Sequence, residues 1–264
     1  MPVEVTLEFI PIFLSVFSGI AVGFTLGLIG GGGSVLAVPL LLYVVGVKDV
    51  HSAIGTSALA VGVIAAINLL GHKKKGNLKI KKGIAFALPG LFGAFFGAQL
   101  GLWTPSENLL LFFAIFMAIV GLLMLRRKTA KYDVVQSTPS YTILSKKSVP
   151  LSGFFVGMMA GYFGIGGGFL IVPSLMYFGG LNIIEAIGTS LMSVSSFGLT
   201  TAASYFIAGN VDLLIATLFV IGGALGGFVG INITEKISKK ILTKTFAILL
   251  FVIAGYIILR LVLF

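Results

Sequence analysis

The pentapeptide Ala-Ile-Gly-Thr-Ser, which places two hydroxyl side chains after a glycine, occurs twice in a chain that is otherwise strongly apolar, at residues 53–57 and 186–190. A hydroxyl can donate a hydrogen bond to an anion, and glycine lets such a group approach the backbone closely. Each pentapeptide begins a long apolar stretch, and unpaired N–H groups at a helix start also favour negative charge. The candidate binding residues in this motif are Gly55, Thr56, Ser57, Gly188, Thr189 and Ser190. The alternative is that these hydroxyls only cap their own helices.

Two runs of glycine supply backbone N–H groups as further donors. Residues 30–33 are all glycine, and residues 164–168 read Gly-Ile-Gly-Gly-Gly. No lysine follows either run at the spacing of a nucleotide-binding loop, which argues against a cradle for ATP phosphates. Each run opens a short apolar segment whose first N–H groups would attract an anion. The candidates here are Gly32, Gly33, Ser34, Gly166, Gly167 and Gly168.

Other polar side chains lie inside apolar stretches. Hydroxyls spaced four, three, four and four residues apart share one face of the second long helix: Thr189, Ser193, Ser196, Thr200 and Ser204. This stripe either lines a polar path, with Ser193 in the binding site, or bonds to its own helix carbonyls. Gln99 and Asn232 occupy equivalent positions and are also taken as candidate binding residues, whereas Asn68 is expected to join neighbouring helices.

The sequence lacks the residues that several kinds of chemistry require. The chain has no cysteine, and no Asp, Glu, Lys or Arg lies deep in an apolar stretch. Nucleophile–base pairs are also missing, so we expect no enzymatic activity, no cofactor and no metal site. His51 and His72 are expected in loops at the ends of apolar stretches, too isolated to bind a metal ion.

The elements that position these residues are predicted to be transmembrane helices. The chain is 58% hydrophobic and only 10% charged, and its apolar stretches are long enough to cross ~30 Å of hydrocarbon. We predict an all-α polytopic bundle with helical segments at 9–29, 34–46, 52–71, 83–102, 106–126, 151–163, 168–179, 186–207, 212–232 and 241–262. The segment at 34–46 is too short to span the bilayer, so the glycine run before it must lie at membrane depth. Consecutive glycines are not expected to be helical themselves.

The two halves of the chain repeat each other. Gly19, Gly23 and Gly27 recur in the second half as Gly153, Gly157 and Gly161, and this spacing of four favours close packing of helices. When the two pentapeptides are aligned with each other, Gln99 also falls on Asn232. We therefore predict an N-terminal repeat at 1–126, a linker at 127–150 and a C-terminal repeat at 151–264.

The distribution of charge predicts that the repeats are inverted. The net charge of +10 is concentrated in loops beside apolar stretches, as the positive-inside rule requires, so we expect no nucleic-acid binding. The loop at 72–82 is lysine-rich, but its counterpart near 208–212 contains no lysine. Equivalent loops therefore face opposite sides, with both termini outside and the linker in the cytoplasm.

The paired glycine blocks resemble the sulfite exporter TauE/SafE family of membrane transporters. The blocks are GIAVGFTLGLIGGGGSVLAVP at 19–39 and GFFVGMMAGYFGIGGGFLIVP at 153–173, and the resemblance covers nearly the whole chain. It implies a secondary transporter in the cell membrane that exports small sulfur-containing anions such as sulfite or organosulfonates. The two repeats predict transport by alternating access. Eight or ten helices are counted, depending on whether the two short segments are included.

Other functions stay open at this point. An anion channel would use the same neutral donors, and an uptake permease would carry a related small anion inward. A purely structural membrane protein would need neither the glycine runs nor the hydroxyl stripe. The sequence also leaves open the cargo, the coupling ion and whether the chain forms a homo-oligomer.

Overall fold

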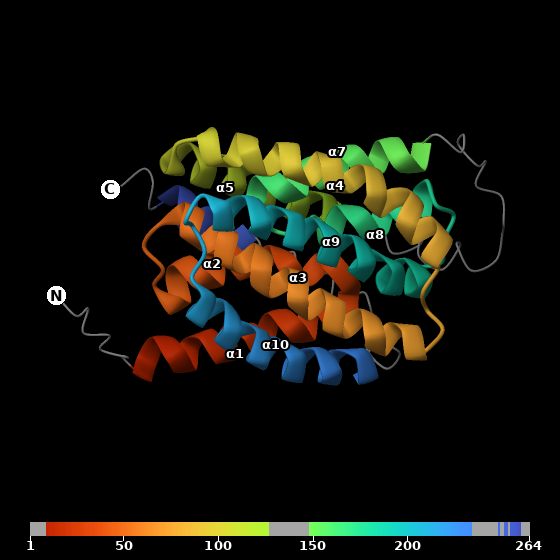
Figure 1. Ribbon diagram of the computed structural model, residues 1–264, viewed down its shortest axis with the longest axis horizontal. Helices are drawn as coiled ribbons and strands as arrows, with labels where there is room; N and C mark the ends of the chain where they lie inside the picture. The colour runs from red at the N-terminus through yellow and green to blue at the C-terminus, as the bar shows by residue number, and fades with distance from the viewer. Residues whose placement is uncertain (1–8, 127–147, 234–247, 249–250, 253, 260–264) are drawn as a thin grey trace.

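A computed structural model describes residues 9–126, 148–233, 248, 251–252 and 254–259 (Figure 1). All secondary structure in these residues is helical, and their helical segments up to residue 233 begin and end as follows. The first half contains α1 (Phe9–Ile29), the 3₁₀ helix η1 (Gly30–Leu36), α2 (Ala37–Leu40), the π-helical turn η2 (Leu41–Val45), α3 (Val50–Lys74), α4 (Ile80–Trp103) and α5 (Ser106–Arg126). The second half contains α7 (Ser148–Phe163), α8 (Gly168–Tyr177), α9 (Ile183–Ile207) and α10 (Leu213–Ile233). The segment predicted at 241–262 lies largely outside the described residues.

The helical membrane architecture predicted from composition is confirmed. Five described stretches are long and apolar enough to cross a membrane: Ile10–Val45, Val50–Lys74, Ile80–Trp103, Ile183–Ile207 and Leu213–Ile233. Apart from the segment after the first glycine run, every predicted segment up to residue 233 begins and ends within three residues of the observed helix. The helix ends agree with the prediction because a helix that crosses hydrocarbon must consist of a long apolar stretch, and such a stretch can be recognised from the local sequence.

The prediction for the first glycine run was wrong. We expected residues 30–33 to be non-helical and residues 34–46 to form an α-helix. Instead Gly30, at φ +73°, redirects the chain into the 3₁₀ helix, and only Ala37–Leu40 is α-helical before a π-helical turn. All seven residues of η1 are buried, and the Ser34 hydroxyl donates to the Gly31 carbonyl at 2.7 Å. Packing on all sides therefore compensates for the poor helix propensity of glycine.

Glycines bring the outer helices into close contact in two pairs. α1 packs along α10, and a Cβ at Gly23 would overlap the Gly223 carbonyl. α4 packs along α7 in the same way, and a Cβ at Gly157 would overlap the Gly90 carbonyl. Gly23 is the counterpart of Gly157 in the repeat, and Gly90 is the counterpart of Gly223, so the two interfaces use equivalent residues. The glycine spacing thus does what the sequence predicted, and it pairs a helix of one half with a helix of the other.

The long helices α3 and α9 occupy the middle layer between these two pairs (Figure 1). They cross at glycines, where a Cβ at Gly198 would lie 2.9 Å from the Ala58 carbonyl oxygen. Figure 1 places the α3–α4 connection and the α9–α10 connection at opposite ends of the bundle. The candidate residues at the starts of α3 and α9 are consequently held inside the bundle and approach its centre from opposite ends.

Candidate functional site at the two glycine turns

Each glycine turn packs against the first turns of the long helix from the other half. A Cβ at Gly30 would lie 2.6 Å from the Ser190 hydroxyl oxygen and 2.9 Å from the Ile187 carbonyl oxygen, both on α9. Gly164, at φ +65°, faces α3 in the same way, and a Cβ there would lie 2.9 Å from the Ile54 carbonyl oxygen. The structure therefore brings each predicted glycine run together with the pentapeptide of the opposite half. Both contacts are fully buried.

The serine of each pentapeptide joins its helix to the facing glycine turn. The Gly31 N–H donates to the Ser190 hydroxyl at 3.2 Å, and the Ser57 hydroxyl lies 3.3 Å from the Gly164 carbonyl. Both hydroxyls also donate to a carbonyl of their own helix, at 2.7 Å for Ser190 and 2.9 Å for Ser57. The hydroxyl hydrogens of these serines are thus already engaged, and their clearest role is to fix the position of the turns.

The threonines use their hydroxyl oxygens in a different way. Thr56 Oγ1 accepts the Asp212 N–H at 2.9 Å, and Thr189 Oγ1 accepts the Lys79 N–H at 3.0 Å. Both donors directly precede a transmembrane helix, so each threonine caps the start of α10 or α4 from the other half of the chain. In the part of the chain that the structure describes, neither threonine donates to an acceptor. Their hydroxyl hydrogens are the side-chain donors that this buried region can offer to a ligand.

The glycines of the pentapeptides make this capping geometry accessible. A Cβ at Gly188 would lie 2.6 Å from the Asn77 carbonyl oxygen, and a Cβ at Gly55 would overlap the equivalent Asn210 carbonyl. A side chain at Gly188 would push the α3–α4 connection away from Thr189, and one at Gly55 would push the α9–α10 connection away from Thr56. Sequence reasoning identified the glycines correctly as sites of close approach, but the group that approaches them is backbone from the other half.

The remaining glycine candidates shape the turns. Gly166 and Gly167 have φ near +63° and +64°, a conformation that other residues rarely adopt, and Gly168 is the first residue of α8. Gly167 is the N-cap residue of α8, and no side chain caps this helix start. Gly32 and Gly33 are buried within η1, and Gly33 is pressed against Leu26 on α1.

Three predicted residues lie apart from these contacts. Ser193 is fully buried one turn beyond Thr189, and its hydroxyl has no hydrogen-bond partner among the described residues. Gln99 is only half-buried on α4, and Asn232 is exposed near the end of α10. The rest of the hydroxyl stripe bonds to its own helix: Ser196 donates to the Met192 carbonyl, Thr200 to the Ser196 carbonyl and Ser204 to the Thr200 carbonyl.

A second pair of polar residues holds α1 against α3. The Asn68 side-chain amide donates to the Gly23 carbonyl at 3.4 Å, which confirms that Asn68 joins helices. His72 Nε2 lies 3.0 Å from the Gly27 carbonyl oxygen and therefore carries the hydrogen. The expectation that both histidines lie in loops was wrong, because α3 extends over Val50–Lys74 and buries His72. The matching spacing of four between Asn68 and His72 and between Gly23 and Gly27 was a signal available in the sequence.

Comparison with known proteins places this architecture in a family. The sequence matches the family described as sulfite exporter TauE/SafE over residues 15–257, nearly the whole chain. The chain belongs to the sulfite exporter TauE/SafE family. It is 44% identical to a probable membrane transporter protein of Xylella fastidiosa over 94% of this chain and 95% of that protein. It is 30% identical to the probable membrane transporter protein YdhB of Bacillus subtilis over 90% of this chain and 96% of that protein.

A more distant relative is the probable membrane transporter protein of Methanocaldococcus jannaschii, 28% identical over 91% of this chain and 93% of that protein. No solved structure matches the chain at a significant level. This TauE/SafE member is a multi-pass membrane transporter, which confirms the predictions of a membrane location and of transport in place of enzymatic catalysis.

Proposed function

We propose that this TauE/SafE member is a secondary transporter that exports small sulfur-containing anions, such as sulfite or organosulfonates, across the cell membrane by alternating access. The observation that carries the proposal is the crossed arrangement of the two glycine turns. Each turn is buried in the bundle and is held against a Gly-Thr-Ser helix start of the other half. Interrupted helices at corresponding positions of two repeats are where secondary transporters bind their substrates.

The donors beside each turn, with Thr56 toward one end of the bundle and Thr189 toward the other, suit a small oxyanion. The hydroxyl hydrogens of Thr56 and Thr189, the unpartnered hydroxyl of Ser193 and the backbone N–H groups of the turns are all neutral. Hydrogen bonds to a charged group are worth ~1.5–3 kcal/mol each, so a few of them hold an anion selectively. A buried lysine would add a fixed charge that slows release, and the described spans place none beside the turns.

Alternating access follows if the two halves are inverted repeats. Equivalent residues form the α1–α10 and α4–α7 contacts, and equivalent connections lie at opposite ends of the bundle (Figure 1). Together with the lysine distribution, this supports repeats at 1–126 and 151–264, both termini outside and a cytoplasmic linker at 127–150. Movement of the α1–α10 pair relative to the α4–α7 pair, each of which contains helices of both halves, would then expose the turns first to one side and then to the other.

The membrane potential is sufficient to drive export of an anion. An inside-negative potential favours outward movement of one negative charge by ~2.3 kcal/mol per 100 mV. The proposal therefore needs no coupling ion. The flux of the anion out of the cell is accordingly expected to increase as the inside becomes more negative.

The test uses purified protein reconstituted in proteoliposomes. We expect saturable sulfite flux that follows the imposed potential, needs no sodium gradient and shows counterflow when unlabelled sulfite is loaded on the far side. Single-channel currents without counterflow would instead identify an anion channel. A parallel panel of thiosulfate, organosulfonates and sulfate, measured as competition against sulfite, identifies the preferred cargo. Absence of saturable flux for sulfite and for every anion of this panel would refute the proposed substrate class.

A further inference from the structure

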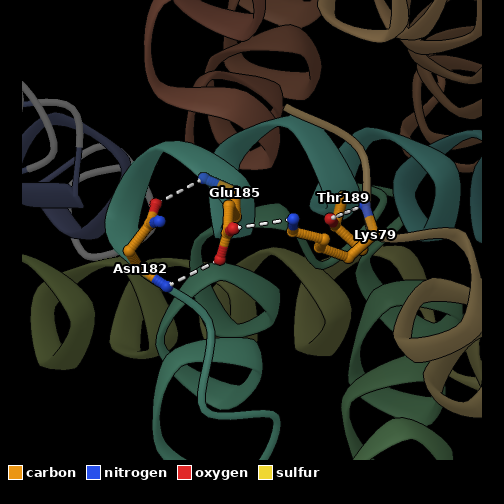
Figure 2. Close-up of polar contacts among 4 residues, drawn as sticks. All are labelled: Lys79, Asn182, Glu185 and Thr189. Atoms are coloured by element: carbon orange, nitrogen blue, oxygen red, sulfur yellow. Dashed lines mark hydrogen bonds and ion pairs between the residues drawn. The ribbon is translucent and has the colours of Figure 1, made fainter. Parts of the chain in front are cut away.

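An ion pair ties the two halves of the chain together directly beside Thr189. The Lys79 ammonium nitrogen lies 3.0 Å from Glu185 Oε1, and the Lys79 backbone N–H donates to Thr189 Oγ1 at 3.0 Å (Figure 2). Lys79 is the residue before α4, whereas Glu185 and Thr189 are in the first turns of α9. One residue of the first half therefore holds the start of a helix from the second half at two points.

The carboxylate of this pair is fixed in place, but the ammonium is not. Glu185 Oε2 accepts the Asn182 N–H at 3.2 Å, and Asn182 Oδ1 accepts the Glu185 N–H at 2.9 Å, which forms a capping box (Figure 2). The Glu185 side chain is 23% exposed and the Lys79 side chain 47% exposed. The ammonium can thus turn toward solvent and exchange one oxygen partner for another, while Glu185 remains at the helix start.

The equivalent positions at the other end of the bundle carry no such pair. In the alignment that superimposes the two pentapeptides, Lys79 corresponds to Asp212, Glu185 to Ser52 and Asn182 to Asp49. The hydrogen bond to the threonine is repeated there, because the Asp212 N–H donates to Thr56. Asp212 and Asp49, however, accept backbone N–H groups of their own helices, from Ile215 and Ser52. The threonine contacts are therefore common to both ends, whereas a cation beside the threonine is confined to the lysine-rich end.

We propose that Lys79 is a receiving site for the oxyanion at the lysine-rich end of the transporter. An incoming anion takes the place of Glu185 on the Lys79 ammonium, which removes one of the two contacts that hold the start of α4 closed against α9 and brings the anion to the Thr189 hydroxyl. This inference rests on the proposed function, since it adds an entry site to the same path. The ligand class is a small oxyanion, which a primary ammonium binds as a point charge.

The strength of the ion pair is suited to such an exchange. Solvent-exposed pairs of this kind shift an equilibrium by only about 1.4- to fivefold. A millimolar oxyanion can compete with a contact that weak, whereas it could not displace a buried pair. At the same time, the pair is strong enough to bias the empty protein toward the arrangement seen here, in which the starts of α4 and α9 are held together and this end is closed.

The test compares two substitutions that remove opposite charges. Glu185→Gln keeps the capping box, because glutamine serves in that position, and leaves the ammonium unpaired. Lys79→Gln keeps the backbone N–H bond to Thr189 and removes the cation. With sulfite as the probe in a binding titration, we expect Glu185→Gln to tighten binding about two- to fivefold and Lys79→Gln to weaken it at least as much. Lys81→Gln, which removes an exposed lysine outside the pair, is the matched control for net charge and should leave binding unchanged.

A purely structural pair would give a different result, because loss of either partner would then change sulfite affinity in the same direction or leave it unchanged. Either of those outcomes overturns the proposal. Opposite effects of the two variants support it.

A second measurement separates this inference from the proposed cargo. The chain has no native cysteine, so Ala186→Cys, at a fully buried position beside Glu185, provides a single labelling site. Without any ligand, labelling by a small thiol reagent should be faster in both single charge variants and stay at the original rate in the Lys81→Gln control. If the original protein binds no sulfite, the proposed cargo fails, and this labelling pattern alone decides whether the pair closes that end. Unchanged labelling in all variants overturns the closure.

Discussion

Replacing Thr189 by valine tests whether the Thr189 hydroxyl donates to the ligand or only caps the start of α4. Valine keeps nearly the same volume and shape but removes the hydroxyl, which accepts the Lys79 N–H at 3.0 Å and whose hydrogen has no acceptor in the described chain. The released N–H lies at a half-exposed residue where water can reach it, so the loss of the cap should cost only ~1 kcal/mol of unfolding free energy. If Thr189 donates to the anion, the lost charge-assisted hydrogen bond is worth ~1.5–3 kcal/mol, or a ten- to hundredfold loss of affinity.

The assay measures sulfite affinity and thermal stability on the same preparations of Thr189→Val and of its twin Thr56→Val. We expect a large loss of affinity with a fall in Tm of roughly 2–4 °C in each. Thr189→Ser, which keeps a hydroxyl, should recover most of the affinity. Thr200→Val is the matched control, because the Thr200 hydroxyl bonds to the Ser196 carbonyl of its own helix, and it should leave affinity unchanged. Unchanged affinity with lowered stability in both variants would mean that these hydroxyls only cap helices, and Ser193 would become the residue to test.

Three further predictions concern the scaffold. Tyr205→Phe should raise unfolding free energy by about 1–3 kcal/mol in a denaturation series, because the buried hydroxyl has no partner among the described residues, and a loss of stability would show that it has one. Gly23→Ala should strongly reduce the yield of monodisperse protein in size-exclusion chromatography, since its Cβ would overlap a facing carbonyl, whereas Gly255→Ala, with open space around it, should not. In intact cells, an impermeant thiol reagent should label a cysteine at Asn210 but not one at Lys75, and labelling of both from outside would rule out inverted repeats.

The sequence by itself determined the features that depend on local physical requirements. A span must be long and apolar to lie in hydrocarbon, so helices such as α1 and α5 begin and end where their apolar stretches do. The spacing of four between Gly19, Gly23 and Gly27 indicates a helix face on which another backbone can rest, and the structure confirms that contact. The similarity of the two halves could be recognised from the sequence for the same reason, because each half carries the same local pattern of glycines and hydroxyl residues.

Tertiary structure decided which groups meet. No local pattern could show that the Thr189 hydroxyl caps the start of α4, because its partner Lys79 is 110 residues away in the chain. The first glycine run is a 3₁₀ helix for a similar reason, since α1, α8 and α9 enclose it and outweigh its low intrinsic propensity. Polar groups buried in hydrocarbon must form hydrogen bonds with the nearest backbone or side-chain group, and only the packed bundle determines which group that is.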